Sequence, residues 1–311
     1  MSIALVFPGQ GAQYVGMGFD FCEGNERANA IFAMAESELK GKLPIRLKDV
    51  MFIGPEEELK KTDYTQPAIF TMSCAIYEAL KDRFAGKVAY TAGHSLGEYS
   101  ALYAAGAFSF QEGIKLVSRR GALMQEASNN SKGCMAAVLG LDDAKIKELC
   151  AKVSSAGYMT AANLNSPGQI VVSGDFEAIE AGESAAKELG AKRYIKLAVA
   201  GAFHSKLMQS AADGLKSVID SYGIKDAAIP VVSNFLAGEI KSAQDIKNAL
   251  INQITGSVRW RESVEYMISK GVDTFVEIGP GAVLSGLIKK IDKNIKVFNI
   301  DKVSDVGKLV L

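Results

Sequence analysis

Short apolar runs alternate with amphipathic stretches along the first third of the chain, and the two patterns predict different elements. Residues 3–7 and 88–92 are compact apolar runs typical of buried strands. Periodic apolar positions over 25–39 and 68–84 instead predict helices. Strands that alternate with helices in this way predict an α/β fold with a mainly parallel sheet.

The segment 128–198 has a pattern of its own. Its predicted elements are strand 134–139, helix 142–153, strands 159–165 and 169–173, helix 175–189 and strand 193–197. This β-α-β-β-α-β order is that of a ferredoxin-like unit. We therefore expect a small ferredoxin-like subdomain at 128–198, inserted into a larger α/β domain that comprises residues 1–127 and 199–311.

The α/β pattern returns after this segment and continues to the end of the chain. The predicted elements are helix 205–222, strand 231–233, helices 242–255 and 261–270, strand 274–278, a helix through 291 and strand 297–300. A single core usually stops growing at roughly 250–300 residues. A chain of 311 residues is therefore long enough for one large and one small domain.

Composition narrows the possible partners and the cellular compartment. Lys plus Arg and Asp plus Glu are equal at 35 each, so the net charge indicates neither a nucleic-acid nor an anionic-membrane partner. The four cysteines form no C-x-x-C pair, which favours reduced thiols and no metal site. There is no signal-peptide pattern and no apolar stretch of ~20 residues. We expect a cytoplasmic protein, and nothing requires more than a monomer.

The most informative motif is a tight turn at 93–97, which lies between a predicted strand and a predicted helix over 98–107. The turn reads G-H-S-L-G and fits the nucleophile elbow G-x-S-x-G, with Ser95 as the nucleophile. Its glycines permit close packing, and the helix N-terminus supplies backbone N–H groups beside the serine. The alternative is an ordinary glycine turn with a helix-capping serine. The flanking strand and helix favour the elbow.

A serine nucleophile needs a base, and the chain has two histidines. His94 is adjacent to Ser95, so its side chain should point to another side of the turn. His204 is therefore the candidate base, although an isolated histidine more often has a structural role. No acidic residue stands out as the third member that orients the imidazole; a backbone carbonyl would do the same and leave no trace in the sequence.

An acyl-transfer site also needs two donors for the oxyanion. The N–H of Leu96, directly after the nucleophile, is one candidate. The loop 9–11, G-Q-G, follows the first strand and is the other, because its glycines permit close backbone approach. The rival interpretation of this loop is a nucleotide phosphate loop. It fails because Tyr14 occupies the third glycine position of G-x-G-x-x-G and no G-K-[ST] follows.

Arg120 lies in the middle of the apolar face of a predicted helix over 112–126, whereas Arg119 lies toward the edge of that face. A buried guanidinium must be paired, because an unpaired buried charge is very costly. One possibility is a structural Asp or Glu. The other is a bidentate clamp for a substrate carboxylate.

Taken together, these motifs resemble the malonyl-CoA:acyl carrier protein transacylases of fatty acid synthesis and the acyltransferase domains of polyketide synthases. The resemblance covers essentially the whole chain. It rests on the blocks F-P-G-Q-G-A-Q at 7–13, G-H-S-L-G-E at 93–98, R-G at 120–121, M-Q-E at 124–126, A-N-L-N-S-P-G-Q at 162–169 and A-F-H-S at 202–205. Ala202 departs from the proline that many relatives carry.

The resemblance implies a role for each matching residue. Ser95 would carry a malonyl ester, His204 would act as base and then as acid, and Arg120 would hold the malonyl carboxylate. Backbone N–H groups of Gln10 and Leu96 would form the oxyanion hole. The main-chain carbonyl of Gln253 would orient His204. The substrate pocket would include Phe203 and Asn165, and the bulk of Phe203 favours malonyl over methylmalonyl groups.

The resemblance also implies a hydrolase-like larger domain, a site in the cleft beside the small subdomain, and a ping-pong transfer from malonyl-CoA to acyl carrier protein without a cofactor. A basic surface for the carrier would comprise Lys192, Arg193, Lys196, Lys289 and Lys290, although each could equally be an ordinary solvated side chain. Two alternatives remain: a serine thioesterase or esterase that uses water, and a non-catalytic module that binds acyl-CoA or the carrier.

Overall fold

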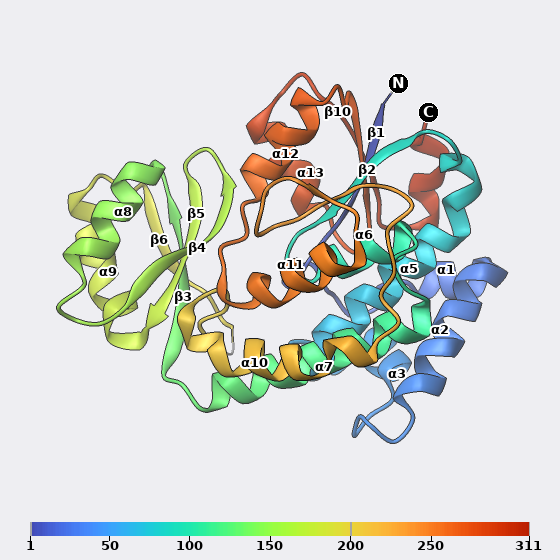
Figure 1. The fold of residues 1–311 in the computed structure, drawn as a ribbon, viewed down its shortest axis with the longest axis horizontal. Helices are drawn as coiled ribbons and strands as arrows, with labels where there is room; N and C mark the ends of the chain where they lie inside the picture. The colour runs from blue at the N-terminus through green and yellow to red at the C-terminus, as the bar shows by residue number, and fades with distance from the viewer. Residues whose placement is uncertain (1, 200, 311) are drawn as a thin grey trace.

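Two sheets organise the computed structural model, which describes residues 2–199 and 201–310 (Figure 1). The larger sheet has six strands in the order β10-β9-β1-β2-β7-β8. Its strands are β1 (Ile3–Phe7), β2 (Val88–Gly93), β7 (Val231–Val232), β8 (Glu239–Ile240), β9 (Thr274–Ile278) and β10 (Lys296–Ile300). Every pair is parallel except β7 with β8, so the predicted mainly parallel sheet is confirmed. Residues 1, 200 and 311, all expected in the larger domain, lie outside the described residues.

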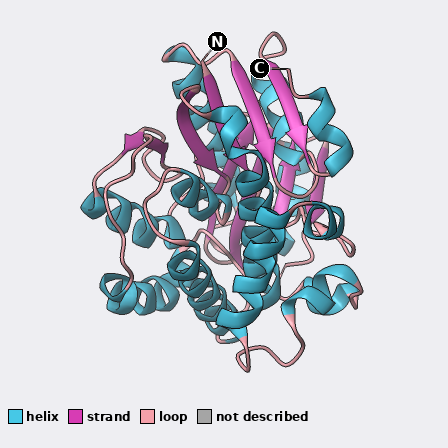
Figure 2. Ribbon diagram, turned by 90° about the vertical axis from the view of Figure 1, so that its right-hand side faces the viewer, coloured by secondary structure: helices cyan, strands magenta, loops and turns pink. Residues whose placement is uncertain are grey.

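Helices flank this sheet on both sides (Figure 2), and the side chains of β1 show why. Ile3, Leu5 and Phe7 belong to one core cluster, with apolar residues of helices such as α2 (Glu26–Leu39). Ala4 and Val6 belong to another, with apolar residues of α12 (Trp260–Ser269) and α13 (Val283–Ile291). A strand buried on both faces needs an uninterrupted apolar run, which is the pattern of residues 3–7.

The second sheet has four strands, all antiparallel, in the order β4-β5-β3-β6. Its elements are β3 (Gly133–Leu139), α8 (Asp143–Lys152), β4 (Met159–Ser166), β5 (Gln169–Asp175), α9 (Phe176–Glu188) and β6 (Arg193–Lys196). Apolar residues of both helices form a separate core with these strands. Asp142 caps α8 by accepting a hydrogen bond from the N–H of Lys145 at 2.9 Å, which explains where that helix begins.

The remaining helices connect and cover the sheets. They are α1 (Phe19–Gly24), α3 (Leu47–Phe52), α4 (Glu56–Leu59), α5 (Thr62–Phe84), α6 (Gly97–Ala104), α7 (Phe110–Asn129), α10 (Gln209–Val218) and α11 (Ala243–Thr255), with short 3₁₀ turns at Lys206–Met208, Ile219–Ser221 and Val303–Lys308. A capping box between Ser109 and Glu112 sets the start of α7. None of the described helices is both long enough and apolar enough to cross a membrane.

Several predicted boundaries were wrong for identifiable reasons. Helix α5 begins at Thr62 rather than at 68, and it contains Pro67, a residue that usually ends or kinks a helix. The expected helix over 205–222 is divided into α10 and two 3₁₀ turns. Helices α1, α3 and α4 were missed, since one or two turns hold too few periodic positions. Strand β8 was missed because two residues show no alternation.

Candidate active site

Ser95 lies in a strained turn between β2 and α6. Its φ is 51°, in the left-handed region that non-glycine residues rarely adopt. A Cβ on Gly97 would lie 2.0 Å from the carbonyl oxygen of Phe7, and one on Gly93 would lie 1.9 Å from the carbonyl carbon of Gly97. Gly97 is therefore required by the close approach of β1, and Gly93 by the close approach of the turn's own backbone, as expected for a nucleophile elbow.

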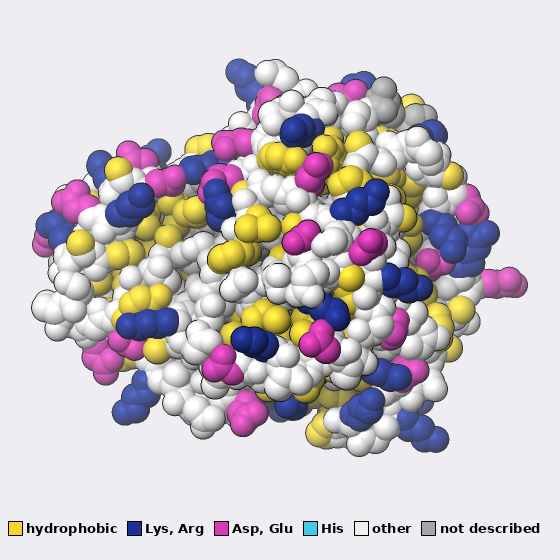
Figure 3. Space-filling model, in the orientation of Figure 1, with side chains coloured by type: hydrophobic (Ala, Val, Ile, Leu, Met, Phe, Trp, Pro, Cys, Tyr) yellow, Lys and Arg dark blue, Asp and Glu magenta, His cyan; other side chains and the backbone are white. Residues whose placement is uncertain are grey.

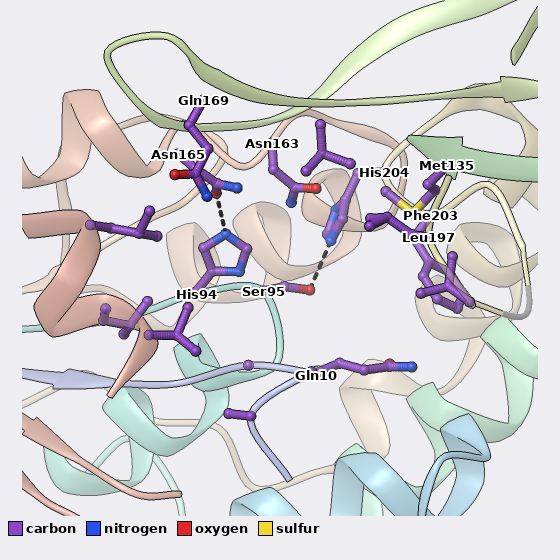
Figure 4. Close-up of a pocket in the computed structure, with 18 of the residues that line it drawn as sticks. Gln10, His94, Ser95, Met135, Asn163, Asn165, Gln169, Leu197, Phe203 and His204 are labelled. Atoms are coloured by element: carbon purple, nitrogen blue, oxygen red, sulfur yellow. Dashed lines mark hydrogen bonds between the residues drawn. The ribbon is translucent and has the colours of Figure 1, made fainter. Parts of the chain in front are cut away.

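A second residue with positive φ, His204 at 56°, faces the serine. The His204 Nε2 atom lies 2.8 Å from Ser95 Oγ (Figure 4). Its Nδ1 atom lies 2.8 Å from the carbonyl oxygen of Gln253. Because a carbonyl only accepts, Nδ1 carries the proton and Nε2 is left to accept the serine proton. Burial, together with the positive charge of Arg120, lowers the pKa of His204 to about 3, so the neutral base form is present at neutral pH.

The Arg120 side chain, 1% exposed, meets neutral acceptors instead of a carboxylate. One terminal nitrogen donates to Gln66 Oε1 at 2.8 Å, and the other donates to Ser95 Oγ and Gln253 Oε1, both at 3.0 Å. The guanidinium carbon lies 5.3 Å from the centre of the Tyr99 ring. Within the described chain Arg120 makes no ion pair, and its Nε has no hydrogen-bond partner. The structural Asp or Glu considered above is therefore not found, and burial lowers the pKa of Arg120.

The loop after β1 packs against the elbow. A Cβ on Gly9 would lie 2.2 Å from the carbonyl oxygen of His94, and the N–H of His94 donates to Phe7 at 3.0 Å. Gln10 lines the same cavity as Ser95. Leu96, fully buried, opens α6, where the first backbone N–H groups have no acceptor within the helix. The structure thus brings together the two segments predicted to supply oxyanion donors.

A cavity of about 230 Å³ lies over these residues and is lined from both sheets. Residues between β3 and the segment after β6 contribute Met135, Asn163, Asn165, Gln169, Val171 and Leu197. Met135, Leu197 and Phe203 gather on the His204 side of the cavity, whereas Asn165 and Gln169 lie above His94 (Figure 4). Asn165 and Phe203, the residues predicted for the substrate pocket, both line this cavity, and Asn165 Oδ1 lies 2.8 Å from His94 Nε2.

The sequence profile described as the acyl transferase domain matches residues 4–309. The chain belongs to the acyl transferase family. The predicted resemblance is thereby confirmed. The chain is 46% identical over 299 residues to the malonyl CoA-acyl carrier protein transacylase of Bacillus subtilis (strain 168), and the match covers 96% of this chain and 93% of that protein. Identity to the transacylase of Staphylococcus aureus (strain MRSA252) is 43%, covering 97% and 96%.

Solved structures of similar proteins share the fold of this acyl transferase. The acyl-carrier-protein-S-malonyltransferase from Bartonella henselae superposes with a TM-score of 0.95 at 38% identity, covering 99% of this chain and 98% of that one. A malonyl-transacylase in complex with its type II polyketide synthase acyl-carrier protein gives a TM-score of 0.94 at 39% identity, with the same coverage.

Three polar residues of the acyl transferase site were missed from the sequence: Gln66, Glu98 and Asn234. Asn234 Oδ1 accepts the N–H of Ser95 at 2.6 Å, and its Nδ2 donates to the carbonyl of Gly93 at 2.7 Å. A signal existed for Asn234, because it follows β7, the parallel neighbour of β2, and such strand ends meet at one sheet edge. Glu98 is fully buried, which raises its pKa to about 7. Gln66 has no comparable signal.

Proposed function

We propose that this chain transfers the malonyl group of malonyl-CoA to the pantetheine thiol of acyl carrier protein through an ester on Ser95. One observation carries the proposal. Ser95 Oγ lies 2.8 Å from His204 Nε2 and 3.0 Å from a buried Arg120 that makes no ion pair with any of the described residues. A nucleophile beside both a base and an unmatched cation suits an acyl group that itself carries a carboxylate. The names of relatives at 43–46% identity support the same substrate.

In the first half-reaction Ser95 Oγ attacks the thioester carbonyl and its proton passes to His204 Nε2. The carbonyl of Gln253 accepts from Nδ1 and stabilises the imidazolium that forms. The backbone N–H groups of Gln10 and Leu96 donate to the oxyanion. When the tetrahedral intermediate collapses, the carbon–sulfur bond breaks, CoA leaves as the thiol with the proton from His204, and the acyl group remains on Ser95.

The second half-reaction repeats these steps in reverse with a different thiol. The pantetheine thiol of the carrier attacks the ester carbonyl while His204 removes its proton. Collapse breaks the bond to Ser95 Oγ, which regains the proton. Throughout the cycle the malonyl carboxylate accepts hydrogen bonds from the Arg120 guanidinium. A charged acceptor thus replaces neutral acceptors of Arg120.

Intact-protein mass spectrometry after brief incubation with malonyl-CoA, followed by a carrier-protein chase, tests the proposal. We expect one malonyl group on the wild-type chain, its transfer to the carrier, and no adduct on Ser95→Ala. An adduct that is discharged only to water would support the thioesterase alternative. No adduct on the wild type would support a binding module, and labelling of Ser95→Ala would refute the assignment of the nucleophile.

We further infer a domain division, with a hydrolase-like part of residues 1–127 and 199–311 and a ferredoxin-like subdomain at 128–198. The β3-α8-β4-β5-α9-β6 order and the antiparallel sheet support the second description. The lining of the cavity by both sheets supports a substrate site in the cleft between them. Limited proteolysis that releases a stable fragment near 128–198 is the expected result.

We also propose that the reaction needs no cofactor, because the nucleophile, the base and the oxyanion donors are groups of the chain itself; activity should survive exhaustive chelation. The monomeric state and the cytoplasmic location stay predictions.

Of the five basic residues considered for carrier binding, Lys196 pairs with Glu180 at 2.6 Å, and Lys289 donates to the carbonyl of Ile295. Acidic and basic side chains are interspersed on the face in Figure 3, so that face offers no surface of one sign.

A further inference from the structure

Glu98 is a fully buried carboxylate in the first turn of α6, three residues after the nucleophile. Its Oε2 accepts the N–H of Asn234 at 3.1 Å and the side-chain Nε2 of Gln253 at 2.6 Å. No ion pair of Glu98 occurs within residues 2–199 and 201–310. Burial raises the pKa of Glu98 to about 7, although the charge of Arg120 acts in the opposite direction. The two groups that Glu98 holds in this buried position are Asn234 and Gln253.

The first of these groups, Asn234, spans the strained elbow. Its side chain accepts from the N–H of Ser95 and donates to the carbonyl of Gly93. Its own N–H is held by Glu98. The carboxylate therefore anchors the residue that fixes the backbone on the N-terminal side of the nucleophile, from Gly93 to the N–H of Ser95, where φ of 51° would otherwise relax.

The second group, Gln253, connects the base to the arginine. Its carbonyl accepts from His204 Nδ1 at 2.8 Å, and its side-chain Oε1 accepts from Arg120 at 3.0 Å. The Nε2 of the same amide donates to Glu98 and, at 3.0 Å, to the carbonyl of Ser95. Two acceptors around Nε2 determine the amide orientation, because a flipped amide would turn its NH₂ toward the guanidinium and its oxygen toward the carboxylate.

We propose that Glu98 is a positioning residue, which holds His204 and Arg120 through Gln253 and the Ser95 elbow through Asn234. It does not touch the reacting atoms. The link to Arg120 rests on the proposed malonyl transfer, whereas the links to His204 and Ser95 depend only on a reactive serine. Loss of Glu98 should therefore affect both the chemical step and the selectivity for a carboxylated acyl group.

The test compares Glu98→Gln and Glu98→Leu with the wild type and with Glu277→Gln. Gln retains an acceptor for Asn234 and Gln253, whereas Leu removes it. Glu277 is a matched control, since it is also fully buried and accepts two N–H groups, those of Leu284 and Ser285, but has no bond to the Glu98 network. Thermal unfolding of each variant establishes that it is folded.

Two activities are measured for each folded variant. The first is the labelling rate of Ser95 by a fluorophosphonate probe, which reports the serine and its base whatever the natural acyl group. The second is kcat and KM for malonyl-CoA and acetyl-CoA. For Glu98→Leu we expect the probe rate to fall about 100-fold, since misplacement by ~1 Å costs about that much. We also expect KM for malonyl-CoA to rise more than KM for acetyl-CoA, and Glu98→Gln to restore most of the probe rate.

Unchanged probe labelling in folded Glu98→Leu would overturn the proposal, as would equal losses in Glu98→Leu and Glu277→Gln. If Glu98→Leu does not fold, Glu98→Gln and Glu98→Asp decide instead. Asp is one methylene shorter and should lose the bond to Gln253, so its probe rate should fall below that of Gln; the reverse order would refute the inference. A wild type that reacts with the probe but rejects malonyl-CoA would contradict the proposed function alone.

Discussion

Removal of the Arg120 guanidinium should slow malonyl transfer far more than acetyl transfer. The cation is fully buried, and its hydrogen-bond acceptors among residues 2–199 and 201–310 are all neutral, so a malonyl carboxylate would be the first carboxylate in direct contact with it. Truncation of one member of a buried charge pair costs about 3–5 kcal/mol. At about 1.4 kcal/mol per tenfold, Arg120→Ala should reduce kcat/KM for malonyl-CoA by roughly 10²–10⁴-fold.

Acetyl-CoA provides the internal comparison, because the acetyl group has no carboxylate. Arg120→Ala also removes the hydrogen bond to Ser95 Oγ, and one charge-assisted bond contributes about 1.5 kcal/mol, so the acetyl reaction should fall by only about tenfold. The assay is single-turnover formation of the acyl-enzyme, quantified by intact mass for both thioesters. Arg119→Ala is the matched control, since Arg119 precedes Arg120 on α7 but is exposed.

Equal fractional losses for malonyl-CoA and acetyl-CoA in Arg120→Ala would refute the reasoning, because Arg120 would then act on the serine and not on the acyl group. A selectivity change of similar size in Arg119→Ala would refute it too. The comparison depends on the ratio of two rates in one variant, so a general loss of folded protein does not affect the conclusion.

Four further predictions rest on the geometry. Because burial lowers the pKa of His204 to about 3, serine labelling should stay constant as pH falls through 6.5; a loss of rate centred at 6.5 would contradict this. The unfolded chain takes up that proton near 6.5 and the folded chain does not, so the free energy of unfolding in urea should fall as pH drops from 6.5 toward 3. Gly97→Ala should lower the free energy of unfolding by about 2 kcal/mol or more, because the new Cβ would lie 2.0 Å from a carbonyl oxygen. Gly286→Ala, in open space on α13, is the control and should raise the free energy of unfolding by about 0.5–1 kcal/mol. Equal effects of the two substitutions would refute the packing argument. Phe203→Ala should raise the methylmalonyl-to-malonyl ratio of kcat/KM about tenfold, and an unchanged ratio would exclude Phe203 as the steric limit.

Local patterns in the sequence were sufficient wherever the cause is local. The continuous apolar run of β1 indicated a buried strand, and the structure has apolar residues from two separate cores around it. A helix was predicted from residue 142, and the Asp142 side chain accepts from the N–H of Lys145 in the first turn of α8. The glycines around Ser95 indicated an elbow, because whether a side chain fits into a tight turn depends on only a few neighbouring residues.

The partners of these local features were decided only by the tertiary structure. Apolar periodicity showed that Arg120 is buried, but it left open whether an acid pairs with it, and the structure supplies two glutamines that lie 54 and 133 residues away. The carbonyl that faces His204 Nδ1 is a main-chain group, which every residue carries, so only the resemblance pointed to Gln253.

The Glu98 network illustrates the same limit. Its bonds to Asn234 and Gln253 join residues 136 and 155 positions apart. Such contacts depend on which strands are neighbours and where each strand ends. The spacing of residues along the chain specifies neither the strand order nor these ends. The amino-acid sequence thus determined which side chains are buried and which turn holds the nucleophile, whereas the packing of the sheet determined which polar groups meet there.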